Sequence, residues 1–147
     1  MRYQLEVEIN APRERVVELF TDADTITEWQ PDLVSFEQLR GEAREPGAST
    51  KQVHRMGKSD VETVETIMVA DAPEHFAALY DSDSVWNLIN NRFIDVGGRS
   101  TRWILESDCR CSSILQQIMI VLFRGSLKKQ SIGMMNRFKA FAEDSLH

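Results

Sequence analysis

Residues 85–111 have the sequence VWNLINNRFIDVGGRSTRWILESDCRC, in which two runs rich in β-branched and aromatic residues flank the pair Gly97-Gly98. Such runs are typical of β-strands. Both central residues of a tight hairpin turn need positive φ angles, which glycine adopts without steric cost. The stretch therefore predicts an antiparallel hairpin that turns at Gly97 and Gly98.

The same pattern extends toward the N-terminus as far as Leu33. Short runs rich in Val, Ile, Thr and Phe are separated by turn residues, at a spacing of about 8–14 residues that leaves no room for crossover helices. Residues 33–111 therefore predict six strands joined as antiparallel hairpins. The turns before residue 85 are Gly41, Pro46-Gly47, Gly57-Lys58, Ala72-Pro73 and Asp81-Ser82-Asp83.

One more strand and several helices are predicted on the two sides of these strands. Residues 2–9 alternate between apolar and polar side chains, which predicts a first strand. Two short helices are expected next, one starting near Pro12 and one ending at Trp29, because Gln30-Pro31 favours extended backbone. After Ser112 the helical period returns and predicts a long C-terminal helical region, with a break or bend at Arg124-Gly125-Ser126.

The composition indicates one packed, soluble domain over residues 1–147. The chain is 42% hydrophobic and 27% charged, close to the globular average. Its net charge of -6 opposes non-specific attraction to nucleic acids, so no nucleic-acid partner is expected.

Neither export nor a structural metal is expected. The N-terminus lacks the basic and apolar regions of a signal peptide, and the longest apolar run, ILQQIMIVLF at residues 114–123, is too short to span a bilayer. Cys109 and Cys111 are two residues apart, at the outer limit for a disulfide within one strand. The three histidines show no metal-ligand spacing to them. We therefore expect a cytoplasmic protein with two reduced thiols and with neither metal nor cofactor.

Five short stretches are informative beside the order of elements: Ile9-Asn10-Ala11-Pro12, residues 16–20, Trp29-Gln30-Pro31, residues 61–67 and residues 128–143. Together with the order of elements, they resemble the START-like SRPBCC superfamily of polyketide cyclases and lipid-transport proteins. The resemblance covers nearly the whole chain. It implies an α+β helix-grip fold, in which a curved seven-stranded antiparallel sheet wraps around a long C-terminal helix, with two short helices between strands 1 and 2. A cavity between sheet and helix is then expected.

The hairpin that turns at Gly57-Lys58 would place His54 and Glu65 on one face of neighbouring strands. A histidine and a carboxylate within reach of each other can act as a general acid/base pair in cyclisation or dehydration of a keto compound. Alternatively, His54 and Glu65 are polar residues with no catalytic role, whose hydrogen bonds are satisfied at the mouth of a cavity or in the sheet. They are candidates, and no catalytic residue is assigned.

Aromatic residues supply further candidates for ligand binding. With Gly97-Gly98 as a two-residue turn, Trp86 and Trp103 share one face, where they could stack on a flat ligand or pack in the core. The complete set of ligand-binding candidates is Trp29, His54, Met56, Glu65, Tyr80, Trp86, Trp103 and Phe123.

The helix from Ile114 to Phe123 is apolar almost all round, which predicts that something covers its outer side. A homodimer through this region ranks first and a lid over the cavity is an alternative. Transient membrane contact ranks last because of the acidic net charge.

Three functions follow as hypotheses. The first is binding or transport of a hydrophobic small molecule, such as a lipid, a polyketide or a similar metabolite, in the cavity. The second is a polyketide cyclase/dehydratase-like enzyme that uses His54 and Glu65 as acid and base. The third is a protein-interaction module of the co-chaperone type. The order of elements and the Met, Trp and Phe residues among the cavity candidates favour the first hypothesis. The sequence lacks the common motifs of hydrolases, kinases, dehydrogenases and metalloproteases, so those classes have no support.

Overall fold

The computed structural model describes residues 1–83 and 85–146, with Met56 described by its backbone alone. Within this part of the chain, seven strands and four helices follow the predicted order, which confirms the α+β helix-grip architecture. The elements are β1 (Arg2–Ile9), α1 (Arg13–Phe20), α2 (Ile26–Trp29), β2 (Leu33–Arg40), β3 (Ser49–Met56), β4 (Ser59–Asp71), β5 (His75–Ser82), β6 (Val85–Val96), β7 (Ser100–Cys111), α3 (Ile114–Leu122) and α4 (Arg124–Asp144).

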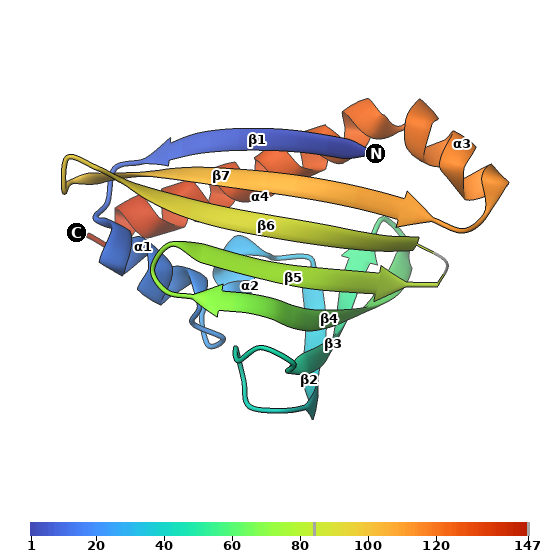
Figure 1. Cartoon of the computed structure of the whole chain (residues 1–147), viewed down its shortest axis with the longest axis horizontal. Coiled ribbons are helices and arrows are strands. Elements are labelled where there is room, and N and C mark those ends of the chain that lie inside the picture. The colour runs from blue at the N-terminus through green and yellow to red at the C-terminus, as the bar shows by residue number, and fades with distance from the viewer. Residues whose placement is uncertain (84, 147) are drawn as a thin grey trace.

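The strands form one antiparallel sheet in the order β1-β7-β6-β5-β4-β3-β2. Strands β2 to β7 each pair with their neighbours along the chain, as the turn spacing predicted, and β1 joins the edge of β7. Helix α4 runs along one face of the sheet, and α1 and α2 lie at one end of the same face (Figure 1). This face is therefore the concave side, on which both the core and any internal cavity must lie.

The core is built where α4 crosses β6 and β7. Phe93 and Trp103 from the sheet and Phe138 from α4 are no more than 1% exposed. The Phe138 ring centroid lies 5.3 Å from that of Trp103 and 4.8 Å from that of Trp29 in α2. Edge-to-face contacts at these distances are favourable beyond the burial of area. This aromatic cluster fixes α2 and α4 against the sheet.

The register of the β6–β7 hairpin differs by one residue from the predicted register. Val96 pairs with Ser100, so the loop contains three residues instead of two, although Gly97 and Gly98 do have positive φ angles of 66° and 77°. A slip of one residue turns every side chain of one strand to the other face. Trp103 consequently lies opposite Phe93 on the concave face, and Trp86 lies on the convex face. The prediction that the two tryptophans share a face was wrong.

The C-terminal helical region is divided in two, as predicted, but the break lies at Phe123, one residue before the expected segment. Gly125 falls in the first turn of α4, where backbone amides have no intrahelical partner and a glycine disturbs little. Helix α3 extends past the end of the sheet (Figure 1). No helix among the described residues is long and apolar enough to cross a membrane.

Candidate functional site

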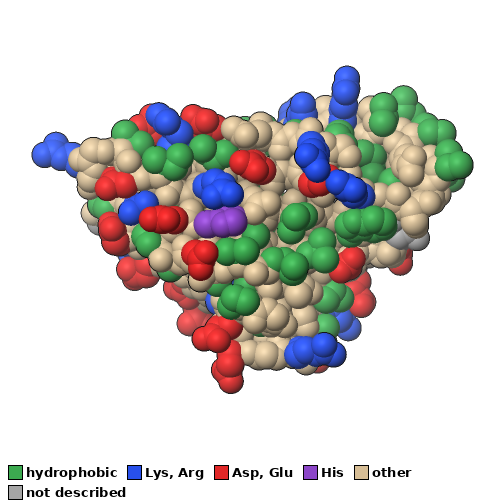
Figure 2. Space-filling model, viewed as in Figure 1, with side chains coloured by type: hydrophobic (Ala, Val, Ile, Leu, Met, Phe, Trp, Pro, Cys, Tyr) green, Lys and Arg blue, Asp and Glu red, His purple; other side chains and the backbone are tan. Residues whose placement is uncertain are grey.

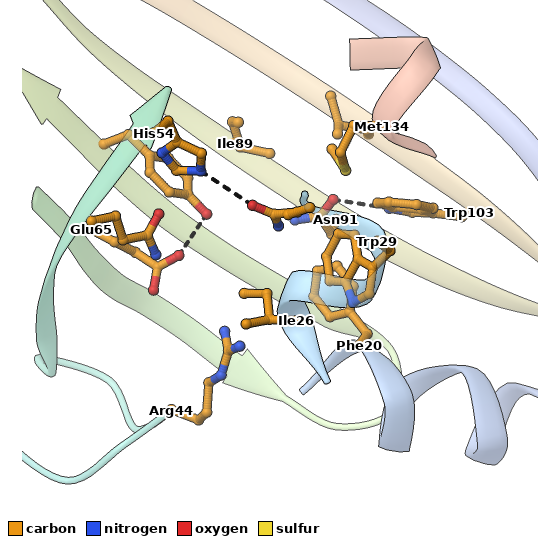
Figure 3. Close-up of a pocket in the computed structure, with 14 residues that line it drawn as sticks. Phe20, Ile26, Trp29, Arg44, His54, Glu65, Ile89, Asn91, Trp103 and Met134 are labelled. Carbon is orange, nitrogen blue, oxygen red and sulfur yellow. Dashed lines mark hydrogen bonds between the residues drawn. The ribbon is translucent and has the colours of Figure 1, made fainter. Parts of the chain in front are cut away.

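A cavity of about 200 Å³ lies between the concave face of the sheet and helices α1, α2 and α4 (Figure 3). All of these elements contribute side chains to it, together with the loop between β2 and β3. The apolar lining consists of Phe20, Ile26, Trp29, Ile89, Trp103, Leu105 and Met134. The polar lining consists of Gln30, Arg44, Gln52, His54, Glu65, Tyr80 and Asn91.

The large aromatic rings of the apolar lining lie apart from His54 and Glu65, although Asn91 lies beside Trp103. Figure 3 shows Phe20, Trp29 and Trp103 together on one side of the cavity, and His54 and Glu65 on the other. We call the first group the aromatic end. We call Arg44, Gln52, His54, Glu65 and Tyr80 the polar end. Such a cavity can hold a molecule that is apolar on one side and carries a hydrogen-bonding group on the other.

The polar end is assembled by strand register. His54 pairs with Val61, and Thr50 pairs with Glu65, so His54 and Glu65 share a face of neighbouring strands as the Gly57-Lys58 turn predicted. Glu65 also pairs with Tyr80 on β5. Both line the one cavity with His54.

The hydrogen bonds differ from the predicted acid/base pair. The Tyr80 hydroxyl donates to Glu65 Oε2 at 2.7 Å, and His54 Nε2 donates to Gln30 Oε1 at 3.3 Å. Glu65 is only 7% exposed, so its bond to Tyr80 compensates part of the cost of burying a carboxylate. The carboxylate is thus joined to a tyrosine, while the histidine contacts the segment after α2.

The environment sets the protonation of two of these groups. Burial lowers the pKa of His54, although the carboxylates of Asp32 and Glu65 partly oppose this effect. His54 is therefore neutral near pH 7. Burial, and then the charge and hydrogen bond of Glu65, raise the pKa of Tyr80 well above its usual value. Tyr80 accordingly keeps its proton and remains a donor.

Arg44 reaches the cavity from the loop between β2 and β3. Its φ angle of 68° lies in the left-handed region, which is unfavourable for a residue with a side chain and costs on the order of 1–2 kcal/mol. The guanidinium points toward the space between Glu65 and Ile26 (Figure 3). Its positive charge lowers the pKa of Tyr80, whereas the charge of Glu65 raises it. The polar end thus contains a cation as well as a carboxylate.

The aromatic end has its own polar contact. Trp103 Nε1 donates to Asn91 Oδ1 at 2.9 Å within the buried interior, which fixes the indole against the cavity wall. Trp29 is 3% exposed, and its Nε1 atom is buried with no hydrogen-bond partner among the described residues. A buried donor without a partner is costly in a folded protein.

The structure brings together five of the eight residues predicted from the sequence. Trp29, His54, Glu65, Tyr80 and Trp103 line the cavity. The other three do not join them in the described structure: Trp86 lies on the convex face, Phe123 is 53% exposed at the start of α4, and the side chain of Met56 lies outside the described part of the chain.

Several lining residues were not predicted. Asn91 and Ile89 share the concave face with Trp103, whereas the predicted two-residue turn at Gly97-Gly98 put Trp103 with the other face of β6. Arg44 lies in a loop, where no periodicity indicates the direction of a side chain. Among the described residues, no three histidine, cysteine, aspartate or glutamate side chains are arranged to hold a metal ion.

The lowered pKa of His54 predicts a pH dependence of stability. The unfolded chain titrates near the ordinary value of 6.5, whereas the folded protein resists protonation, so the unfolded state binds more protons between the two pKa values. Stability is complete above pH 6.5 and decreases as the pH falls toward the lowered pKa. We expect the urea midpoint of the wild-type protein to fall more steeply than that of His54→Gln between about pH 7 and about pH 5. Parallel curves would contradict the lowered pKa.

Comparisons with known proteins place this geometry in context. No protein-family model matches the sequence, and no curated protein sequence matches it. Solved structures do match. The Zhui aromatase/cyclase from Streptomyces sp. R1128 has a TM-score of 0.84 at 13% identity, over 100% of this chain and 96% of that chain. A START superfamily protein from Mycobacterium smegmatis has a TM-score of 0.78 at 12% identity, over 97% of each chain. Norcoclaurine synthase from Thalictrum flavum, solved with dopamine and hydroxybenzaldehyde, has a TM-score of 0.74 at 12% identity, over 98% of this chain and 87% of that chain. The chain therefore has the helix-grip fold of the START/SRPBCC-like proteins.

Proposed function

We propose that this protein binds a small, largely apolar molecule in the cavity between the sheet and α4. The observation that carries the proposal is the division of one internal cavity into an aromatic end and a polar end. An apolar ring system would pack against Trp29 and Trp103, and a hydroxyl or carbonyl group would bind at the polar end. Binding, or binding followed by transport, is the activity that such a cavity supports best.

The size of the cavity restricts the class of ligand. About 200 Å³ is below the roughly 300–1,000 Å³ of typical drug-sized ligand sites. A molecule of one or two fused rings suits this space, whereas a lipid with a long acyl chain or an extended polyketide exceeds it. The norcoclaurine synthase structure supports this choice, because dopamine and hydroxybenzaldehyde each contain a single ring.

The polar end would give the ligand its orientation. Arg44 offers a cation, Tyr80 a hydroxyl and Gln52 an amide, all of them partly or wholly withdrawn from water. Hydrogen bonds to charged groups are stronger than those between neutral groups. The unfavourable backbone angle of Arg44 is consistent with a functional role for its side chain, since such conformations cluster at ligand sites.

A second candidate function is acid–base catalysis on a ligand in the same cavity. The observation that favours it is the 2.7 Å bond between Tyr80 and Glu65, with the neutral imidazole of His54 facing the same space. A neutral histidine can accept a proton, and the Tyr80 oxygen can hold a polar group of the ligand beside it, as an acid–base step on a keto compound requires. For an enzyme, His54→Ala would abolish turnover and leave ligand affinity nearly intact. Equal loss of both would identify His54 as a binding residue.

The binding proposal can be tested by filling the cavity. Ile89 lines the cavity from β6, and Ile89→Trp would occupy much of its volume. With 2-naphthol as the probe, we expect the wild-type protein to bind it by isothermal titration calorimetry, with a change in tryptophan fluorescence from Trp29 and Trp103. Ile89→Trp should weaken this binding at least about tenfold, which corresponds to a loss of about 1.4 kcal/mol.

Ile94→Trp is the matched control, because Ile94 lies on the convex face of the same strand. It should leave 2-naphthol binding unchanged. Equal binding by both variants, or no binding of 2-naphthol and related one- and two-ring compounds by the wild-type protein, would rule out the cavity as their site.

A further inference from the structure

Helix α3 exposes its apolar residues to solvent. Its outer face, defined here as seven residues, is 46–75% exposed. Hydrophobic side chains gather at the end of the molecule where α3 lies in Figure 2. Exposed apolar patches of this kind mark interaction sites in stable proteins. The seven residues are Ile114, Leu115, Ile118, Met119, Val121, Leu122 and Phe123.

The side of α3 that turns toward the protein is the more polar one. Gln116 and Ile120 are half-buried, and Gln117 Nε2 donates to the Cys111 carbonyl at 3.3 Å. The Gln116 Oε1 atom is buried with no hydrogen-bond partner among the described residues. A surface helix normally turns its apolar stripe inward and its polar residues outward. In α3 only Ile120 among the apolar residues is half-buried and the other apolar side chains are exposed, which indicates that its outer face is made for another surface.

The charge of the sequence segment that contains α3 is opposite to that of the whole chain. Residues 109–142 contain six lysines and arginines and no aspartate or glutamate, although the chain has a net charge of -6. Arg124, Lys128 and Lys129 follow α3 directly on the first turns of α4, and all three are exposed. None of them forms an ion pair with a described carboxylate. Their charge is therefore free to act on an external partner.

These features fit an anionic lipid surface better than a second copy of the chain. A symmetric dimer through the outer face would bring together two basic segments, neither of which contains an acidic residue. A bilayer surface with anionic headgroups offers both an apolar layer for the seven side chains and negative charge for the three cations. The acidic remainder of the chain does not prevent this, because salt screens charges beyond about 8–10 Å.

We propose that α3 docks this protein on an anionic membrane surface, with its outer face in the lipid interface and with Arg124, Lys128 and Lys129 at the headgroups. The helix lies on the membrane and does not cross it. This reverses the ranking that net charge alone suggested, in which a homodimer came first.

Flotation with vesicles tests the proposal. We expect the protein to float with vesicles of phosphatidylcholine containing about one third phosphatidylglycerol, and to float far less with phosphatidylcholine alone. Arg124→Gln/Lys128→Gln/Lys129→Gln should weaken binding to the anionic vesicles on the order of 100-fold, at about fivefold per charge. Ile118→Asn/Leu122→Asn should weaken it at least about tenfold, since two apolar side chains leave the interface.

Matched variants separate docking from general effects. Val34→Asn/Leu39→Asn alters two residues on β2 that are each 49% exposed, close to the 51% of Ile118, and should leave flotation unchanged. Ile89→Trp should float normally, which makes this result independent of ligand binding in the cavity. Absence of flotation with anionic vesicles would overturn the proposal. A dimer in light scattering that Ile118→Asn/Leu122→Asn abolishes would overturn it in favour of a second copy.

Discussion

Replacement of Phe138 by alanine is expected to lower the free energy of unfolding by about 3–5 kcal/mol. Phe138 is 0% exposed, and its ring lies within 6 Å of the ring centroids of Phe20, Trp29 and Trp103. Its removal opens a void where α2, α4 and the sheet meet, and the surrounding rings cannot close it without moving a whole helix. A domain of this size has only about 5–15 kcal/mol of stability in total, so the loss is a large part of it.

Urea denaturation followed by tryptophan fluorescence measures this effect. Phe36→Ala is the matched control, because Phe36 lies on β2 and is 46% exposed. It should cost less than about 1 kcal/mol, since much of its ring already contacts water. A loss at Phe138 no greater than that at Phe36 would mean that the aromatic cluster does not hold the helices on the sheet.

The residues of this cluster also explain why the fold could be predicted from sequence. Phe138 lies on the apolar stripe of a long helical pattern, and the alternation in residues 2–9 predicts the first strand. Both patterns are local consequences of helix and strand periods, and the structure confirms the elements that they predict. The short turn at or next to Gly57-Lys58 likewise predicted that His54 and Glu65 share a face, and the pairing of β3 with β4 confirms it.

The candidate site could be predicted only in part, because it depends on single-residue register and on loops. The three-residue turn at residues 97–99 puts Trp103 on the same face as Asn91 and opposite to that of Trp86, so the predicted grouping of Trp86 with Trp103 was wrong and Asn91 was not among the candidates. Strand period alone cannot distinguish a two-residue from a three-residue turn when both begin with Gly-Gly. The position of the Arg44 side chain depends on an uncommon backbone angle, which no local sequence pattern predicts. Tyr80 and Glu65 were both candidates, but their contact required the pairing of β4 with β5.

The hydrogen bond between Tyr80 and Glu65 predicts the second large loss of stability. Tyr80→Phe removes only a hydroxyl, yet we expect it to lower the free energy of unfolding by about 1.5–3 kcal/mol. The reason is that the Glu65 side chain, 7% exposed, loses the donor at 2.7 Å and is left as a buried acceptor without this partner. Urea denaturation at pH 7 measures the loss.

The double variant Glu65→Leu/Tyr80→Phe provides the decisive comparison. Replacement of both partners by apolar groups leaves no buried polar atom of the pair without a partner, so this variant should be nearly as stable as the wild type. The coupling energy of the cycle should then exceed about 1 kcal/mol, whereas losses that add within about 0.5 kcal/mol would show that no such bond forms.

The double variant Glu65→Leu/Tyr80→Phe should keep its stability but lose affinity for the ligand. If the polar end orients the ligand, the double variant loses affinity for 2-naphthol although it is stably folded, because neither acceptor nor donor remains at Glu65 and Tyr80. If replacing Glu65 and Tyr80 leaves stability unchanged but weakens binding, the role of the pair is to recognise the ligand. Retention of full affinity by the double variant would instead assign the pair to the packing of the sheet and leave Arg44, Gln52 and His54 as the groups that recognise the ligand.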